Sequence, residues 1–357
     1  MIRIKNSVIQ LPAYEVPQKA RIKLNQNESP YDILAEYKSE ILNRLRKISW
    51  NRYPVENPQD LKRQLADYTG HPAEGIVVGN GSNELILACM LATCDKGDRV
   101  TVIRPGFAIY PYLAQILQLK IDKVPLLADF SFDIKKLLRS VKNSKIAFFA
   151  TPNNPTGTTI DIDGIEEVLR IKNSIVVVDE AYYEFHGLTC QRLLDRYENL
   201  LILRTFSKAF GIAGVRLGYL LCNPDIAKHM VKAKPPFSIG IFQQVVAEYL
   251  LSKKGLVLDT VRKIVMEREK VFNRLKSIPE IMPIPSRANF ILFGIKNYSS
   301  IDFFHRLYKK GILVRRFSGP DLKKFLRVTI GKPEENEEFI KKIKQIIKKP
   351  GGQNAQC

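Results

Sequence analysis

The stretch "TFSKAFGIAGVRLGY" (residues 205–219) follows a strand-like apolar run and carries a distinct group of polar side chains. It holds one lysine, Lys208, with hydroxyls at Thr205 and Ser207 before it and Arg216 after it. An arginine and hydroxyls suit a phosphate, to which they give charge-assisted hydrogen bonds. A desolvated lysine near cationic groups loses part of its affinity for a proton and becomes nucleophilic. The stretch therefore predicts an amine beside an anion-binding site at the end of a strand.

Short apolar, β-branched runs recur through the first two-thirds of the chain, and helix-like segments such as 82–92 and 162–172 lie between them. The runs are "GIVVG" (75–79), "RVTVIRP" (99–105), "KIAFFATP" (145–152), "SIVVVDEAY" (174–182) and "LLILRTFS" (200–207). Continuous apolar strands alternating with helices predict an α/β fold with a largely parallel sheet buried on both faces. Sheets of this kind bind ligands at the carboxyl ends of their strands.

The pattern changes after about residue 250. A helical apolar stripe is followed by strand-like runs at 289–295 and 325–331, which predict a smaller α+β domain. The stripe consists of Val261, Ile264, Val265, Val271, Phe272 and Leu275. The expected organisation is an N-terminal segment (1–45) packing with the small domain, a large domain (46–250), the small domain (251–350) and a frayed tail (351–357).

Composition excludes several classes of protein. The 357 residues are 45% hydrophobic and 26% charged, which is typical of a globular chain, and the sequence has no apolar run long enough to span a membrane. The N-terminus lacks the apolar block of a signal peptide, so a cytoplasmic location is expected. Five scattered cysteines predict reduced thiols and no metal site. The net charge of +20 is spread along the whole chain, which argues against a nucleic-acid or membrane partner and favours a solvated surface that attracts anionic substrates.

Three further motifs fall where predicted strands end. "GNGSNE" (79–84) opens a helix whose backbone amides, with Ser82, suit a phosphate. In "VVVDEAY" (176–182), Asp179 is suited to pair with a protonated ring nitrogen. The tyrosine that ends this motif and an asparagine of "TPNNPTG" (151–157) are suited to hydrogen-bond a phenolate oxygen. A lysine that attacks a carbonyl, a ring-nitrogen partner, a phenolate site and a phosphate site together describe pyridoxal 5'-phosphate.

These motifs resemble those of the fold-type I, aspartate-aminotransferase-like enzymes, which use pyridoxal 5'-phosphate, and within them the histidinol-phosphate aminotransferase branch. The resemblance runs from about residue 11 to residue 336. It rests on "LNQNESP" (24–30), "RYP" (52–54), "GNGSNE", "TPNNPTG", "VVDEAYYEF" (177–185), "TFSKAFGIAGVRLGY", "GILVR" (311–315) and "LRVTIG" (326–331). It implies a large domain with a mostly parallel central sheet, a smaller α+β domain and a homodimer with shared active sites.

The resemblance also implies roles for single residues. Lys208 would bond covalently to the cofactor and then move the substrate's proton, with Asp179 on the pyridine nitrogen and Tyr182 on the phenolic oxygen. The other cofactor-binding residues would be Asn154 at the phenolic oxygen, Phe107 stacked on the ring, Ser82, Asn83, Thr205, Ser207 and Arg216 at the phosphate, and Tyr53 reaching the phosphate site of the neighbouring subunit. Two of these residues have an alternative interpretation without a role in binding the cofactor. Phe107 would then be an ordinary core residue, and Tyr53 would be a turn residue.

The implied substrates are glutamate and a phosphorylated imidazole compound. Arg327 would grip the α-carboxylate bidentately, and Arg315 would meet the substrate phosphate. Because neighbouring strand residues point to opposite faces, either Arg315 or its neighbour Arg316 should face the site, and the place of Arg315 in "GILVR" favours it. Tyr14, Tyr53 and Asn27 complete the implied substrate-binding set.

The expected reaction is transamination between glutamate and imidazole-acetol phosphate, which gives histidinol phosphate and 2-oxoglutarate. Two alternatives use the same scaffold: an aromatic amino acid aminotransferase and a threonine-phosphate decarboxylase. A third alternative is a transcription regulator that only senses pyridoxal phosphate. It is disfavoured because the aminotransferase-like motifs begin near residue 11 and leave no room for a DNA-binding module.

Overall fold

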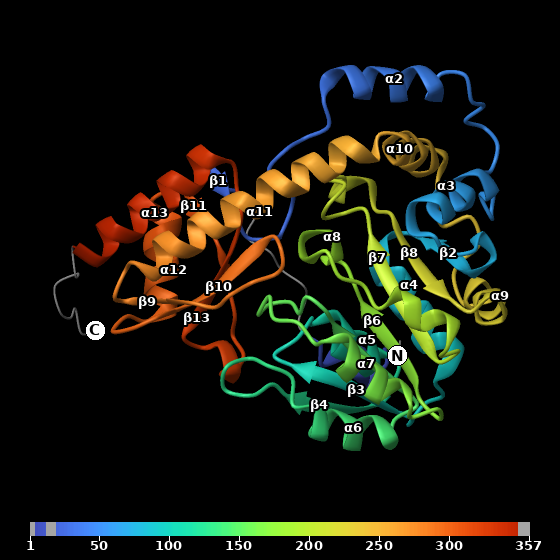
Figure 1. Ribbon diagram of the computed structural model, residues 1–357, viewed down its shortest axis with the longest axis horizontal. Coiled ribbons are helices and arrows are strands. Elements are labelled where there is room, and N and C mark those ends of the chain that lie inside the picture. Colours follow the sequence, from blue (N-terminus) through green and yellow to red (C-terminus); the bar gives the residue numbers. More distant parts are fainter. Residues whose placement is uncertain (1–3, 12–18, 349–357) are drawn as a thin grey trace.

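The apolar runs of the first two-thirds form one seven-stranded sheet in the computed structural model, which describes residues 4–11 and 19–348 (Figure 1). In sheet order its strands are β2 (Ile76–Gly79), β8 (Gly218–Cys222), β7 (Leu200–Thr205), β6 (Ile175–Asp179), β5 (Ile146–Ala150), β3 (Arg99–Arg104) and β4 (Lys120–Pro125). β8 runs antiparallel to both of its neighbours, and the pairs from β7 to β4 are parallel. The prediction of a largely parallel sheet is therefore confirmed.

Two of these strands were not predicted. β8 lies at the end of the glycine-rich stretch that carries Lys208, where the apolar run is short. β4 is an edge strand, and its sequence "KIDKVP" is charged and only partly buried. Lysines on an edge strand discourage pairing with other chains, and they also hide the strand from a search for apolar runs.

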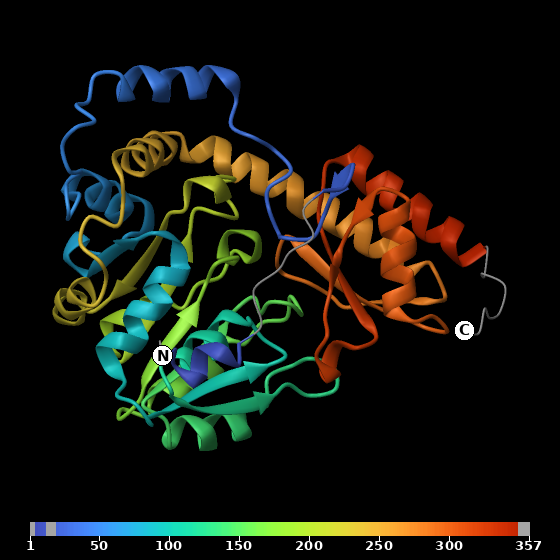
Figure 2. The same cartoon turned by 180° about the vertical axis from the view of Figure 1, so that it is seen from behind.

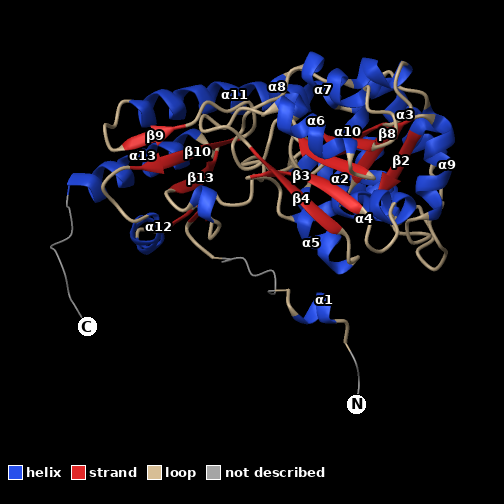
Figure 3. Cartoon of the chain, turned by 90° about the horizontal axis from the view of Figure 1, so that it is seen from below, coloured by secondary structure: helices blue, strands red, loops and turns tan. Residues whose placement is uncertain are grey.

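The sheet is covered on both faces, as the alternation along β6 shows. Val176 and Val178 belong to one apolar cluster, whereas Val177 belongs to the other. Figure 3 shows the strands between α6 and α7 on one side and α4 and α5 on the other. The helices packed around this sheet are α3 (Gln59–Thr69), α4 (Gly81–Thr93), α5 (Ile109–Ile116), α6 (Ile134–Lys142), α7 (Ile162–Leu169), α8 (Tyr183–His186), α9 (Pro224–Lys232) and α10 (Ile241–Ser252).

The C-terminal third forms a second sheet, shown in orange and red in Figure 1. Its antiparallel strands, in sheet order, are β12 (Arg315–Arg316), β13 (Phe325–Thr329), β10 (Phe290–Ile295) and β9 (Ile281–Pro283). Helices α12 (Ser300–Lys309) and α13 (Pro333–Lys348) pack beside it. The long helix α11 (Lys254–Lys276) runs from one sheet to the other and buries Val261, Ile264, Val271 and Leu275 of the predicted stripe.

The N-terminal segment is divided between the two parts of the molecule. β1 (Ile22–Lys23) pairs with β11 (Ile312–Leu313) near the second sheet. α2 (Ala35–Leu45), the dark blue helix at the top of Figure 2, instead packs against α10. The short α1 (Asn6–Ile9) contacts α5. The prediction that residues 1–45 pack with the small domain is therefore wrong for α2, whose apolar side, with Ile41 and Leu45, lies over the large sheet's helices.

The part of the molecule around the second sheet also contacts the large sheet's part beside the carboxyl ends of the large sheet's strands. Arg104, the last residue of β3, forms an ion pair of 3.2 Å with Asp321. Phe130 packs edge-on against Phe325, with ring centroids 5.3 Å apart. These contacts hold the second sheet over the carboxyl ends of the first.

No helix within residues 4–11 and 19–348 is long and apolar enough to cross a membrane. The cysteines in the described ranges, Cys89, Cys94, Cys190 and Cys222, carry free thiols, and Cys94 is only partly buried. The described residues contain no cluster of side chains that suits a metal ion. The predicted frayed tail (351–357) lies outside the described residues.

Candidate active site

The chemically active side chains gather at the carboxyl ends of β6 and β7. Asp179 is the last residue of β6, and Thr205 is the last residue of β7. Asp179 lies two residues after Val177, and Thr205 lies two residues after Leu203. Val177 and Leu203 both belong to the apolar cluster under α4 and α5. Because strand side chains alternate between faces, Asp179 and Thr205 point to the side of the sheet that these two helices cover.

Lys208 lies three residues beyond β7, and its Nζ donates a hydrogen bond of 3.0 Å to the carbonyl oxygen of Gln26. Desolvation, with the nearby charges of Arg327 and Arg216, lowers the pKa of Lys208 to about 8, and the carboxylate of Glu28 opposes this shift. At pH 7 about a tenth of such amines are neutral, because the ratio of the two forms changes tenfold per pH unit. Lys208 is therefore poised to act as a nucleophile or a base.

An anion-binding cradle lies beside the lysine. Arg216 Nη1 donates a hydrogen bond of 3.2 Å to Ser207 Oγ, and the first residue of α4 is Gly81. A Cβ at Gly81 would lie 2.5 Å from Arg216 Nη2, so this approach of the guanidinium to the helix N-terminus requires glycine. Ser82 is half-buried and Asn83 is exposed in the same first turn. Amides at a helix start, hydroxyls and a guanidinium together suit a phosphate.

Asp179 is a buried carboxylate with a hydrogen-bond donor on each oxygen. The Tyr110 hydroxyl donates to Oδ2 at 2.6 Å, and the Ala181 amide donates to Oδ1 at 3.0 Å. Desolvation raises the pKa of Asp179, while these two hydrogen bonds and the positive charge of Lys208 oppose the rise. Phe107, half-buried, meets the Tyr110 ring edge-on with centroids 5.4 Å apart. A carboxylate held in this way suits a partner with an N–H bond.

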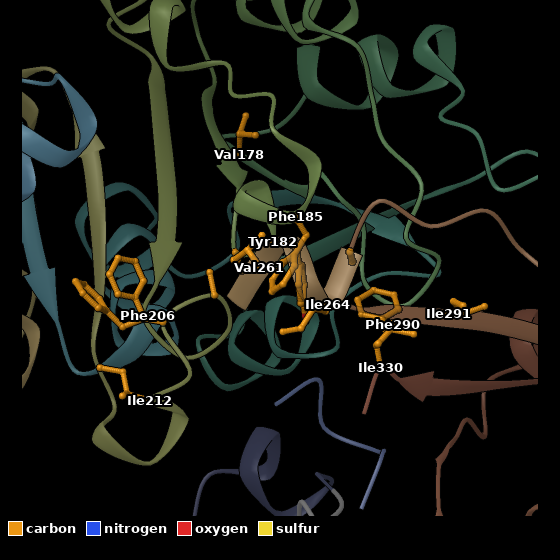
Figure 4. Packing of buried hydrophobic residues seen from close by; sticks show 14 of the residues in the cluster. Val178, Tyr182, Phe185, Phe206, Ile212, Val261, Ile264, Phe290, Ile291 and Ile330 are labelled. Carbon is orange, nitrogen blue, oxygen red and sulfur yellow. The ribbon is translucent and has the colours of Figure 1, made fainter. Parts of the chain in front are cut away.

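Tyr182 and Asn27 form a second polar group at the site. Asn27 Nδ2 donates a hydrogen bond of 2.9 Å to the Tyr182 hydroxyl oxygen, and the Asn27 amide donates one of 2.9 Å to Thr329 Oγ1. Burial raises the pKa of Tyr182 to about 12, so its hydroxyl stays protonated at neutral pH. Figure 4 shows Tyr182 beside Phe185 and the α11 residues Val261 and Ile264, which fix its ring.

Arg327 connects the second sheet to the strand ends of the first. Its Nη2 donates a hydrogen bond of 2.8 Å to the carbonyl oxygen of Asn25, and its Nη1 donates one to Asn154 Oδ1. Arg315 lies directly opposite Arg327 in the β12–β13 pair. Residues directly opposite in an antiparallel pair share one face, so both arginines lie on the site side of the sheet. Arg316 is exposed and lies on the other face, with its guanidinium 6.0 Å from the centroid of the Phe304 ring.

Among the described residues, one predicted site residue, Tyr53, is not brought together with the others. Tyr53 is 82% exposed and stacks on Phe237, with ring centroids 4.8 Å apart. Tyr14 lies outside the described residues.

Two contributors to the site, Tyr110 and Gln243, are not among the residues predicted from the sequence. Tyr110 carries a signal in the sequence, because it is an aromatic residue only three positions after Phe107, at the start of α5. Gln243, whose Nε2 donates to the Arg216 carbonyl oxygen at 2.7 Å, carries none.

Comparisons with known proteins agree with this geometry. Residues 19–343 match the family described as aminotransferase class I and II. The histidinol-phosphate aminotransferase of Thermococcus kodakarensis is 39% identical over 345 residues, which cover 96% of this chain and 98% of that protein. The enzyme of the same name from Thermococcus gammatolerans is 38% identical over 328 residues, covering 91% and 92%.

Among solved structures, histidinol-phosphate aminotransferase from Sinorhizobium meliloti, in complex with pyridoxal-5'-phosphate, superposes with a TM-score of 0.90. The superposition covers 98% of this chain and 99% of that one at 22% sequence identity, so this likeness concerns the fold. The predicted fold type, that of the aspartate-aminotransferase-like enzymes, is thus confirmed. On the match that spans most of its length, the chain belongs to the class I and II aminotransferase family.

Proposed function

We propose that this aminotransferase transfers the amino group of glutamate to imidazole-acetol phosphate, giving histidinol phosphate and 2-oxoglutarate, with pyridoxal 5'-phosphate as cofactor. The substrate assignment rests on relatives named histidinol-phosphate aminotransferase that are 36–39% identical over at least nine-tenths of the chain. The observation in the structure that carries it is the pair Arg315 and Arg327, side by side on one face of the second sheet. Like charges directly opposite are unfavourable, so an anionic ligand would be stabilised there.

The residues present fit the cofactor. The cradle of Arg216, Ser207 and the start of α4 would hold its phosphate, and the close approach at Gly81 makes that cradle compact. Asp179 would hold a proton on the ring nitrogen, and Phe107 would cover the ring. When bound, the cofactor supplies an electron sink for the pair of electrons left when the substrate's Cα loses its proton.

Lys208 performs the proton transfer in this proposal. Its amine would hold the cofactor in the resting protein. During the reaction the Nζ would take the proton from the substrate's Cα, and its lowered pKa of about 8 makes a neutral amine accessible at physiological pH. Tyr182 and Asn154 would hydrogen-bond the phenolic oxygen, and Asn27 orients the Tyr182 hydroxyl.

Arg327 and Arg315 would divide the recognition of anions. Arg327 is buried and fixed by Asn25 and Asn154, so it presents a rigid fork that suits the α-carboxylate shared by all amino donors. Arg315, half-buried and nearer the edge of the sheet, would meet the substrate phosphate. Tyr14, Tyr53 and Asn27 complete the proposed substrate-binding set.

Arg315→Gln is expected to raise KM for histidinol phosphate by about tenfold to a hundredfold, the effect of losing one hydrogen bond to a charged group. The rate with phenylalanine, which lacks a phosphate, should stay unchanged. Steady-state kinetics with both substrates measures this difference. Arg316→Gln is the matched control, because Arg316 is the neighbouring residue on the opposite face, and its KM values should stay within about twofold. Equal effects of the two variants would remove Arg315 from the phosphate site.

We also propose that two copies of the chain share their active sites. Large apolar side chains are exposed around Tyr53 and the loop on which it stacks, in a patch that suits a second copy. They are Trp50, Tyr53, Val55, Phe237 and Phe242. Glu56 connects the segment that carries Tyr53 to the loop that carries Phe237. Its carboxylate accepts hydrogen bonds from the Phe237 amide and, at 3.4 Å, from Lys234 Nζ. Tyr53 of one copy would thereby reach the phosphate cradle of the other.

Sharing is tested by mixing two impaired proteins, Lys208→Ala and Tyr53→Ala, after reversible dissociation. Mixed dimers hold one site with both residues intact, so about a quarter of the parental activity should return, since half of the dimers are mixed. Light scattering reports the mass before and after mixing. Dimers that form without any recovery of activity would show that each site is built from one chain.

The proposed reaction is tested by a half-reaction. Histidinol phosphate is added alone, without a keto acid, to the cofactor-loaded protein, and conversion of the visible cofactor band to the pyridoxamine form is expected. Conversion by tyrosine or phenylalanine only would support an aromatic aminotransferase. Release of carbon dioxide from threonine phosphate would support the decarboxylase. A protein that takes up no cofactor would contradict the proposal entirely.

A further inference from the structure

Tyr110 makes a buried hydrogen bond to Asp179 for which the proposed reaction has given no role. The phenol oxygen lies 2.6 Å from Asp179 Oδ2, and the Ala181 amide occupies the other carboxylate oxygen. Tyr110 is 2% exposed and Asp179 is 4% exposed, so water is excluded from the pair. A short hydrogen bond to a carboxylate in a dry environment is among the strong ones in proteins.

The Tyr110 ring is held so that its hydroxyl points steadily at the carboxylate. It stacks on Phe148 of β5, with centroids 5.2 Å apart and planes 23° apart, and it meets Phe107 edge-on at 85°. Phe107 and Tyr110 come from the same short segment at the start of α5, whereas Asp179 ends β6. Burial next to the carboxylate also keeps the pKa of Tyr110 well above its ordinary value, so the phenol remains a donor across the whole working range of pH.

The charge of Asp179 depends on its hydrogen bonds. Burial favours the neutral acid, and the Tyr110 hydroxyl, the Ala181 amide and the positive charge of Lys208 favour the carboxylate. Glu180, the other carboxylate near Asp179, also favours the neutral acid, but it is engaged by Arg204 at 2.9 Å on the opposite face of the sheet. An aspartate that becomes neutral would let the proton leave a ring nitrogen beside it, and the ring would then withdraw electrons less strongly.

We infer that Tyr110 is a positioning residue for Asp179: its hydroxyl keeps the carboxylate charged and oriented so that the ring nitrogen of the bound cofactor stays protonated. This inference rests on the proposed function. It gives the Phe107–Tyr110 segment two roles. Phe107 would cover the cofactor ring, and Tyr110 would keep the ring nitrogen protonated through Asp179.

The test is the nitrogen chemical shift of pyridoxal phosphate labelled with ¹⁵N in its ring and bound to the whole protein. In the parent protein the shift should be that of a protonated pyridine. In Tyr110→Phe, which keeps the ring contacts and removes only the oxygen, it should move toward the unprotonated value. The same variant should lower kcat by about tenfold to a hundredfold, the effect of one lost charge-assisted hydrogen bond, with KM for glutamate little changed.

Tyr249→Phe is the matched control, because Tyr249 is also fully buried but lies on α10, away from the site. It should leave both the nitrogen shift and kcat unchanged. A fluorinated tyrosine at position 110, a stronger donor of the same shape, should move the shift in the opposite direction to Tyr110→Phe. This variant also covers the case in which Tyr110→Phe does not fold.

The outcomes separate this inference from the proposed function. A parent protein that binds no cofactor contradicts the proposed function. A protonated nitrogen that is unchanged in Tyr110→Phe and in the fluorinated variant contradicts the inference alone. A lower melting temperature of Tyr110→Phe with an unchanged nitrogen shift also overturns it, because that result describes a structural role only.

Discussion

Lys208→Ala is expected to lower kcat by at least about four orders of magnitude, because it removes the proposed base for the Cα proton. The protein should still bind pyridoxal phosphate, since Arg216, Ser207 and the start of α4 do not depend on the amine. Single-turnover absorbance with glutamate measures the first effect, and equilibrium dialysis of the cofactor measures the second. The expected result is therefore a loaded but inactive protein.

The matched control is Lys62→Met, because desolvation lowers the pKa of Lys62 too, but Lys62 lies on α3 away from the site. Its kcat should stay within about twofold of the parent. Turnover retained in Lys208→Ala would remove the lysine from the mechanism. A complete loss of cofactor binding would show that the phosphate cradle is too weak to act without the covalent bond.

Asp179→Asn is expected to lower kcat by about 10²-fold to 10⁴-fold. The amide has nearly the same shape, but it carries no negative charge, so it cannot hold a proton on the ring nitrogen. The electron pair left at Cα then has a poorer sink, and the proton-transfer step slows. The measurement is the rate of the glutamate half-reaction, followed by the change in the cofactor's absorbance.

Asp122→Asn serves as the control for this variant. Asp122 is a half-buried carboxylate of β4 that accepts a hydrogen bond of 2.5 Å from Ser140, and it belongs to no part of the site. It should have little effect on the half-reaction. An Asp179→Asn protein with near-parental rates would contradict the ring-nitrogen role, and with it the role inferred for Tyr110.

Local sequence signals account for a large part of the site. Lys208, Asp179 and Ser82 each stand where an apolar strand gives way to a turn or a helix, and parallel strands bring such ends to one edge of a sheet. Continuous apolar runs identified the sheet for the same reason, because only a sheet covered on both faces buries every side chain along a strand. The edge strand β4 escaped prediction because its charged residues break that pattern.

The sequence by itself determined the fold class and the grouping of Lys208 with Ser207 and Arg216, because these depend on contacts between neighbours in the chain or on the edge of one sheet. The tertiary structure decided what depends on register and on packing between distant segments. It placed Arg315 and not Arg316 on the face of Arg327, since β12 pairs with β13 in that register. It set α2 over α10, and it brought the Tyr110 hydroxyl to Asp179 across 69 residues of chain. No local pattern encodes such pairings, because they arise from the packing of side chains between elements that are far apart in the sequence.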